Sequence, residues 1–135
     1  EQSLEMAALA RDAATGSAQV TVLHDPVESF QSAHRADAVL FCYTHDVLQS
    51  PTALANLFEQ VRPGARVAVA GLCLAPWWGA PANAWVLWGA RNYLTTWHGL
   101  RRPWAPLLAW CPDLRVVGRH HLGTGYLAVG RASGR

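Results

Sequence analysis

Two apolar runs separated by the pattern of a single amphipathic helix constrain the fold of this chain more than any other feature. The runs predict strands over 38–43 and 66–72, and neither alternates apolar with polar residues. Strands without that alternation are typical of parallel sheets whose two faces are both covered by helices. The Ser-Pro pair at 50–51 predicts the start of the intervening helix, and the Pro-Gly pair at 63–64 predicts its end. The stretch therefore predicts two parallel strands linked by a helix.

The polar residues that follow the first of these strands are the first place to look for chemistry. Val39 and Val67 are expected in neighbouring parallel strands, whose carboxyl ends open onto a shared cleft. Ligands of open α/β sheets bind in the crevice outside those ends. Because the segment from Tyr43 to Asp46 leaves the first strand at this edge, it is the leading candidate for binding or catalysis.

The remaining patterns complete an α/β order within one domain. Around the central stretch they predict a helix over 3–14, a strand over 19–23, a helix from 83 to 94, a short helix over 103–109, and a terminal hairpin of strands over 114–122 and 126–129. A length of 135 residues suits a single domain with one core.

Composition excludes several classes of partner. All eleven basic residues are arginine, nine acids oppose them, and no basic run is present, so no nucleic-acid partner is expected. Cys42, Cys73 and Cys111 lie far apart without a CxxC pair, which predicts buried thiols in a reducing compartment and no metal site. The first residues do not resemble a signal peptide, so a cytoplasmic location is expected.

One segment is apolar enough to require a membrane test. No charge occurs between Arg66 and Arg91, a span long enough to cross a bilayer if it were helical. Pro76 and Pro81, with glycines around them, would break such a helix. The segment is therefore predicted to form strand, loop and helix, and no membrane partner is expected.

Several of these blocks resemble the class I S-adenosylmethionine-dependent methyltransferases. EQSLEM is similar to the end of that family's second strand, ADAVLFCYTHDVL to its fourth strand and loop, SPTALANLFEQVRPGARVAVAG to its next helix and fifth strand, and GTGYLAVGR to its closing antiparallel strand. The resemblance implies an α/β, Rossmann-like three-layer sandwich with a mainly parallel sheet and an antiparallel C-terminal hairpin. The family's Gly-rich loop has no counterpart here, so residues 1–135 are expected to be one N-terminally truncated domain without the first two strands.

The resemblance also implies which residues contact S-adenosylmethionine. Glu1 takes the place of the acid that binds the two ribose hydroxyls, a task that suits a carboxylate because it only accepts hydrogen bonds. Gln2 and Ser3 lie beside it in the same motif. The methionine portion of the cofactor would lie beside the residues that end the fourth strand, namely Cys42, Tyr43 and Thr44.

The position of a second acid, which contacts the adenine amino group, is open between two alignments. An alignment of Val27 and Glu28 with the family's pattern places Pro26 there, and a shift by one residue places Asp25 there. A carboxylate accepts a hydrogen bond from the amino group and a proline side chain cannot, which favours Asp25.

His45 and the tryptophans are the candidates for the acceptor side of the reaction. His45, next to Asp46, is either a general base or substrate-orienting group, or an ordinary polar loop residue. All seven tryptophans lie between 77 and 110, and the region after the family's fifth strand commonly helps to form the acceptor pocket. Four of them either line that pocket or form core and a homo-oligomer interface: Trp77, Trp78, Trp85 and Trp88.

These features predict an enzyme that transfers a methyl group from S-adenosylmethionine to a small molecule, incomplete in the chain as given. Two alternatives stay open. A nicotinamide-dependent oxidoreductase on a related scaffold is disfavoured because the sequence contains no GxGxxG motif. A noncatalytic Rossmann-like partner domain is the other alternative.

The lack of a Gly-rich loop predicts that residues 1–135 alone bind S-adenosylmethionine weakly or not at all. In the family, that loop brings the backbone close to the amino-acid end of the cofactor. Isothermal titration of S-adenosylmethionine into this chain checks the prediction, and tight binding would contradict it.

Overall fold

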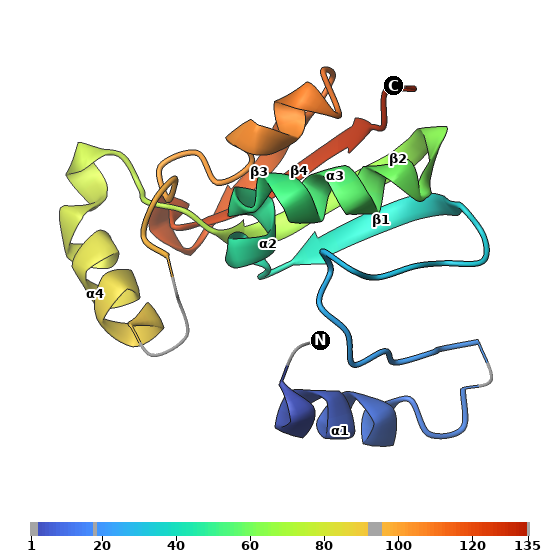
Figure 1. The fold of residues 1–135 in the computed structure, drawn as a ribbon. Helices are drawn as coiled ribbons and strands as arrows, with labels where there is room; N and C mark the ends of the chain where they lie inside the picture. Colours follow the sequence, from blue (N-terminus) through green and yellow to red (C-terminus); the bar gives the residue numbers. More distant parts are fainter. Residues whose placement is uncertain (1–2, 18, 92–95, 135) are drawn as a thin grey trace.

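A four-stranded sheet organises the structure, which is a computed structural model that describes residues 3–17, 19–91 and 96–134. The strands lie in the order β1-β2-β4-β3 (Figure 1). Their bounds are Ala36–Cys42 for β1, Val61–Leu72 for β2, Arg115–His120 for β3 and Gly125–Arg131 for β4.

The parallel pairing predicted from the sequence is confirmed. Strands β1 and β2 pair in parallel, and Val39 lies directly opposite Val67. Strand β4 pairs antiparallel with both β2 and β3, so β3 runs parallel to the first two strands. The terminal hairpin is therefore also confirmed, and the carboxyl ends of β1 and β2 meet at one edge of the sheet.

The crossover between β1 and β2 consists of two helices, where the sequence predicts one. Helix α2, His45–Gln49, follows β1 almost at once, and α3, Pro51–Glu59, completes the crossover. The side chain of Ser50 caps α3 by accepting a hydrogen bond from the backbone N–H of Ala53 at 3.2 Å. Leu54 and Phe58 then bury the inner side of α3 against the sheet.

The Pro-Gly pair at 63–64 does not end this helix, which is a correction to the sequence prediction. Helix α3 ends at Glu59, and β2 already begins at Val61. Between the register pairs Ala36–Val61 and Ala38–Arg66, β2 holds three more residues than β1. The Pro-Gly pair therefore forms a bulge in the strand, where Gly64 has a φ of +78°.

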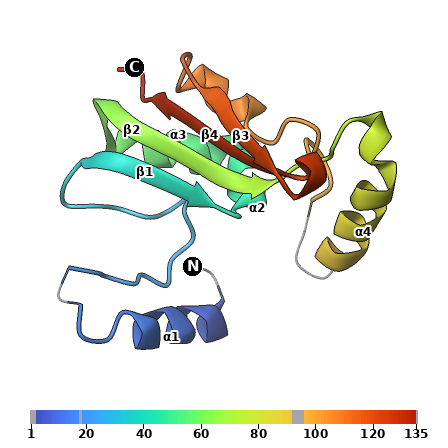
Figure 2. The ribbon, with the colours of Figure 1, turned by 180° about the vertical axis from the view of Figure 1, so that it is seen from behind.

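Within residues 3–17, 19–91 and 96–134, helices cover only one face of the sheet. Helices α2 and α3 and the short 3₁₀ helix η2, Ala105–Ala109, lie on the face nearest the viewer in Figure 1. Seen from behind, the other face carries no helix among the described residues (Figure 2). Leu40 on that side is 67% exposed, whereas Val67 and Val69 on the covered side are buried. The second helical layer of the predicted three-layer sandwich is therefore not confirmed.

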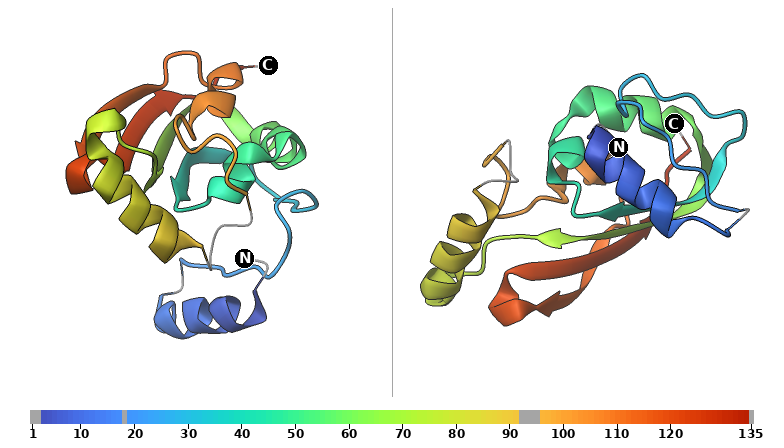
Figure 3. Two further views of the ribbon diagram at one scale, coloured as in Figure 1. Left: turned by 90° about the vertical axis from the view of Figure 1, so that its left-hand side faces the viewer. Right: turned by 90° about the horizontal axis from the view of Figure 1, so that it is seen from below.

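The predicted strand over 19–23 is wrong. Helix α1, Leu4–Ala13, forms as the sequence predicts, with Ser3 as its N-cap, and lies beyond the β1 edge of the sheet (Figures 1 and 3). The segment 19–23 is a loop. A β-branched run becomes a strand only when its backbone pairs with a neighbour, and the sheet does not extend to this segment.

The core lies between the covered face and its helices. Phe58 stacks on Trp110 with ring centroids 5.2 Å apart, and Trp104 contacts Tyr126 at 4.7 Å. Cys73 and Cys111 are buried as predicted, but Cys42 is exposed, because it lies two residues after Leu40 on the edge strand β1 and so points to the same uncovered side. Burial and, secondly, the charge of Asp113 raise the pKa of Cys111 from 9.0 to about 11.

The free energy of unfolding is therefore expected to fall as the pH rises from about 9 to about 11. In this window the unfolded thiol of Cys111 has lost its proton while the folded thiol keeps it, which is worth roughly 2 kcal/mol. Cys111→Ala should make the fall shallower, and Cys42→Ala should leave it unchanged. Urea unfolding at about pH 8 and about pH 11 measures the difference. An equally steep fall in Cys111→Ala would contradict this account.

Candidate functional site

A cavity of about 450 Å³ lies at the carboxyl ends of β1 and β2. Its floor is formed by the strand ends and Tyr126, one side by the start of α2, and the other by helix α4, Ala80–Ala90, which stands beyond the strand ends (Figure 1). Its lining comprises Tyr43, Thr44, His45, Leu48, Ala70, Gly71, Leu72, Trp85, Val86, Trp88, Gly89, Leu100 and Tyr126. This is the crevice in which α/β sheets bind ligands, as the sequence predicts.

The backbone of Tyr43 turns the chain from β1 into the cavity. Its N–H donates to the carbonyl of Ala70 at 2.9 Å, which holds the turn to the end of β2. Its φ of +55° lies in the left-handed region, which costs a non-glycine residue about 1 kcal/mol or more. Strained residues of this kind cluster at functional sites. The turn brings Thr44 and His45 to the cavity wall.

His45 is held in one orientation by a backbone carbonyl. Its Nε2 lies 2.9 Å from the carbonyl oxygen of His98, and a carbonyl can only accept, so Nε2 carries the hydrogen. In the neutral ring Nδ1 then has a free lone pair. The partner of the imidazole is thus this carbonyl, while the adjacent Asp46 is exposed. The role of His45 as a general base or substrate-orienting group stays a prediction.

The turn that carries this carbonyl is fixed by Gly99. Its φ is +76°, and a Cβ at this position would lie 2.5 Å from Oε1 of Gln49. The N–H of Leu74 donates to the carbonyl of Leu100 at 2.8 Å, which ties the turn to the segment after β2. The position of the His98 carbonyl, and with it the orientation of His45, therefore depends on a glycine in this turn.

Two polar atoms at the cavity have no hydrogen-bond partner. They are Oγ1 of Thr44 and Nδ1 of His45, and both are buried. Buried polar atoms nearly always have a partner, because an unpaired one costs about 1–3 kcal/mol. Two neighbouring unpaired atoms beside a cavity are the arrangement expected where a ligand supplies the missing partners.

The cavity is aromatic, and its lining contains no Asp, Glu, Lys or Arg. Trp85 and Trp88 line it from α4, and the exposed guanidinium of Arg91 lies 5.1 Å from the ring centroid of Trp88, outside the lining. Asn83, at which the predicted helix over 83–94 begins, lies within α4, which starts at Ala80. Its side-chain amide accepts from the N–H of Ala75 at 2.7 Å and donates to the carbonyl of Ala75 at 3.0 Å. This pair of bonds anchors α4 to the segment after β2.

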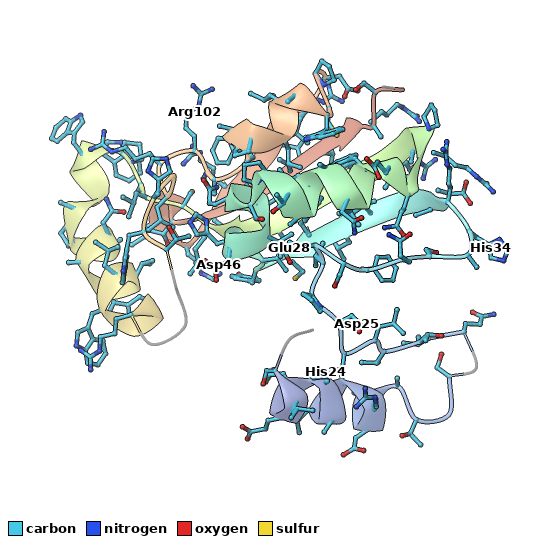
Figure 4. The ribbon with its side chains drawn as sticks, viewed as in Figure 1. His24, Asp25, Glu28, His34, Asp46 and Arg102 are labelled. Carbon is cyan, nitrogen blue, oxygen red and sulfur yellow. The ribbon has the colours of Figure 1, made fainter. Side chains whose placement is uncertain are left out.

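The structure brings together only part of the predicted set of site residues. Tyr43, Thr44, His45, Trp85 and Trp88 line the cavity. The other described candidates lie outside the cavity. Ser3 caps α1, and Cys42 is exposed. Asp25, Pro26 and Val27 lie in the loop before β1, and Trp77 and Trp78 lie in the 3₁₀ helix η1, Trp77–Gly79, which precedes α4. Figure 4 shows Asp25 near α1, well away from Asp46 on α2.

Glu1 and Gln2 lie outside the described residues, so their role at the ribose stays a prediction. Trp77 is 89% exposed and does not line the cavity, so a homo-oligomer interface stays the prediction for this tryptophan. The predicted helix over 83–94 extends beyond the described part of α4, since residues 92–94 are not described.

Sequence reasoning missed Tyr126, which lines the cavity, and His98, whose carbonyl orients His45. Tyr126 is buried, and its desolvation, with a smaller contribution from Cys73, raises its pKa, so its hydroxyl stays protonated. A Cβ at Gly71 would lie 3.3 Å from its ring, so this glycine leaves room for the tyrosine. Gly71 pairs with Tyr126 across β2 and β4, and no local sequence pattern predicts this contact between distant segments.

Comparison with known proteins supports the fold and leaves the family open. No family model and no curated protein matches the sequence. A structure of a possible exported protein from Bordetella parapertussis is 16% identical, with a TM-score of 0.61, and the match covers 99% of this chain and 52% of that one. N-methyltransferase NodS from Bradyrhizobium japonicum WM9, in complex with S-adenosyl-L-homocysteine, is 16% identical, with a TM-score of 0.54 and coverages of 93% and 61%.

The fold is therefore methyltransferase-like, an α/β fold with an open mixed sheet. This chain spans between half and about three-fifths of the length of these two structures. In the parts of the chain that the structure describes, no helix is long and apolar enough to cross a membrane. The same parts contain no cluster of three metal-ligating side chains.

Gly89 offers a direct test of the cavity. A Cβ there meets no atom within 4 Å, so Gly89→Ala should leave the cavity open and stabilise α4 by up to about 1 kcal/mol. Gly89→Phe should fill the cavity and weaken the binding of indole, a small aromatic probe. Thermal unfolding measures the first effect and calorimetric titration the second. Equal indole affinities in the two variants would show that indole binds outside this cavity.

Proposed function

We propose that this protein transfers a methyl group from S-adenosylmethionine to a small molecule held in the cavity at the ends of β1 and β2. The observation that carries the proposal is this cavity: it lies at the carboxyl ends of parallel strands, in a sheet whose fold resembles that of an N-methyltransferase solved with S-adenosyl-L-homocysteine. Ligands of α/β sheets bind at this edge, so fold and cavity favour the same reaction site.

The residues of the cavity suit the reacting end of such a donor. S-adenosylmethionine supplies a methyl group bonded to a positively charged sulfur. The aromatic rings of Tyr43, Trp85 and Trp88 favour a cation through their quadrupoles, and the guanidinium of Arg91, 5.1 Å from the ring centroid of Trp88, lies outside the lining. The polar ends of the donor find no charged side chain here. For these ends we propose Cys42, Asp25, Pro26 and Val27, with Glu1, Gln2 and Ser3.

Methyl transfer depends chiefly on proximity and in-line alignment of the two reactants. The ends of β1 and β2 and the start of α2 line the cavity on one side, and the tryptophans of α4 line it on the other. His45 adds a hydrogen-bond acceptor at Nδ1, where a proton from the methyl acceptor would be received. No observation on the described residues favours a nicotinamide-dependent reaction or a noncatalytic role.

Methyl transfer to a panel of metabolites should be detectable with the protein expressed from its complete reading frame. With S-adenosylmethionine labelled in its methyl group, mass spectrometry should show a labelled product and an equal amount of S-adenosylhomocysteine. His45→Ala should lower kcat by roughly 100-fold, the usual size of a general-base contribution. His34→Ala is the matched control, since His34 is exposed and far from the cavity (Figure 4).

The proposal fails if the wild-type protein neither binds S-adenosylmethionine nor releases S-adenosylhomocysteine with any acceptor. Equal kcat values for His45→Ala and His34→Ala would instead leave methyl transfer standing and remove the base from His45.

A further inference from the structure

We infer that the methyl acceptor is an uncharged, flat, apolar molecule with one hydroxyl group, and that Nδ1 of His45 receives the hydroxyl proton. The inference rests on the proposed function and names the substrate class of the same cavity. Three independent properties of the cavity lead to it: the absence of charge in its lining, its aromatic walls, and the two unpaired polar atoms at one side.

The lining excludes charged acceptors. The lining contains no Asp, Glu, Lys or Arg, so a carboxylate, phosphate or ammonium that entered would lose its hydration without one of these side chains to pair with. Leu48, Leu72, Val86 and Leu100 make most of the remaining wall apolar. An uncharged molecule meets no such cost and gains the burial of its apolar surface.

The aromatic residues favour a flat shape. Trp85 and Trp88 lie on one helix at a spacing of three residues, so they share a face of α4. Tyr43 and Tyr126 line the cavity from the sheet side. Aromatic ligands gain offset-stacked or edge-to-face contacts in such a setting, beyond the burial of area. A volume of about 450 Å³ holds one or two fused rings beside the donor's methyl group.

The unpaired atoms specify one hydroxyl. Nδ1 of His45 can only accept, because the His98 carbonyl keeps the hydrogen on Nε2. The hydroxyl of Thr44 can donate. An O–H group satisfies both atoms, since it donates to Nδ1 and accepts from Thr44, whereas a carboxylate has no hydrogen to give to Nδ1. Both atoms are buried, so contact requires a small shift of these side chains that keeps the bond from Nε2 to the His98 carbonyl.

Two bonds break and two bonds form in the proposed transfer. The oxygen–hydrogen bond of the acceptor breaks, and an oxygen–carbon bond to the methyl group forms. The sulfur–methyl bond of the donor breaks, and its electron pair returns to sulfur, which becomes neutral. The proton passes to Nδ1 of His45, and the resulting imidazolium keeps its bond to the His98 carbonyl and later releases the proton to water.

Binding without donor tests the acceptor class separately from methyl transfer. Three probes share one ring system: 2-naphthol carries the hydroxyl, 2-methylnaphthalene lacks it, and 2-naphthoate replaces it with a charge. Calorimetric titration into the wild-type protein should rank 2-naphthol first and 2-naphthoate last. Thr44→Val keeps the side-chain shape and removes the hydroxyl, so it should weaken 2-naphthol by roughly 3- to 10-fold, the usual effect of one hydrogen bond, and leave 2-methylnaphthalene unchanged.

Nitrogen NMR of protein with ¹⁵N-labelled histidine tests the tautomer. The signals of His45, assigned by their loss in His45→Gln, should show a proton on Nε2 and a bare lone pair on Nδ1. A proton on Nδ1 would overturn the proposed role of His45. Binding of 2-naphthoate as tight as that of 2-naphthol, or no binding of any probe, would overturn the acceptor class. A protein that binds 2-naphthol yet transfers no methyl group to any acceptor would refute only the proposed function.

Discussion

The parallel pairing of β1 with β2 is the constraint on which the rest of the structure depends. Parallel strands cannot be joined by a tight turn, so the chain must cross over, and here α2 and α3 make that crossing above one face. The pairing also forces both strands to end at the same edge. The polar residues that follow β1 and the residues that end β2 therefore lie side by side at one cavity.

Mostly different aromatic residues pack in the core and line the cavity. Trp104 and Trp110 pack with Tyr126 and Phe58 beneath the helices, while Trp85 and Trp88 stay on α4 at the cavity. Tyr126 belongs to both groups, since it is buried in the core cluster and also forms the cavity floor. This shared residue makes the shape of the cavity depend on the packing of the sheet.

In the described residues, the sheet face opposite α2 and α3 and the β1 edge of the sheet are uncovered. Leu40 and Val117 on the strands are well exposed, and β1 has a neighbour on one side only among the described strands. Exposed apolar edge strands are prone to pair with other chains. The cavity does not depend on this face, because its walls come from the strand ends, α2, α4 and the turn before η2.

The sequence by itself determined the elements whose signals are local. The apolar runs, the Ser50 cap and the glycine-bearing hairpin predicted the parallel pair, the start of α3 and the closing strands, and they placed Tyr43, Thr44 and His45 at the correct edge.

Only the tertiary structure decided the rest. A strand over 19–23 needs a neighbour that the sheet does not provide, and the Pro-Gly pair became a bulge because β2 had already begun pairing. The tautomer of His45 depends on the carbonyl of His98, 53 residues further along the chain. Local patterns report a residue's intrinsic preferences, but a hydrogen bond between distant segments exists only once the fold has brought both partners together.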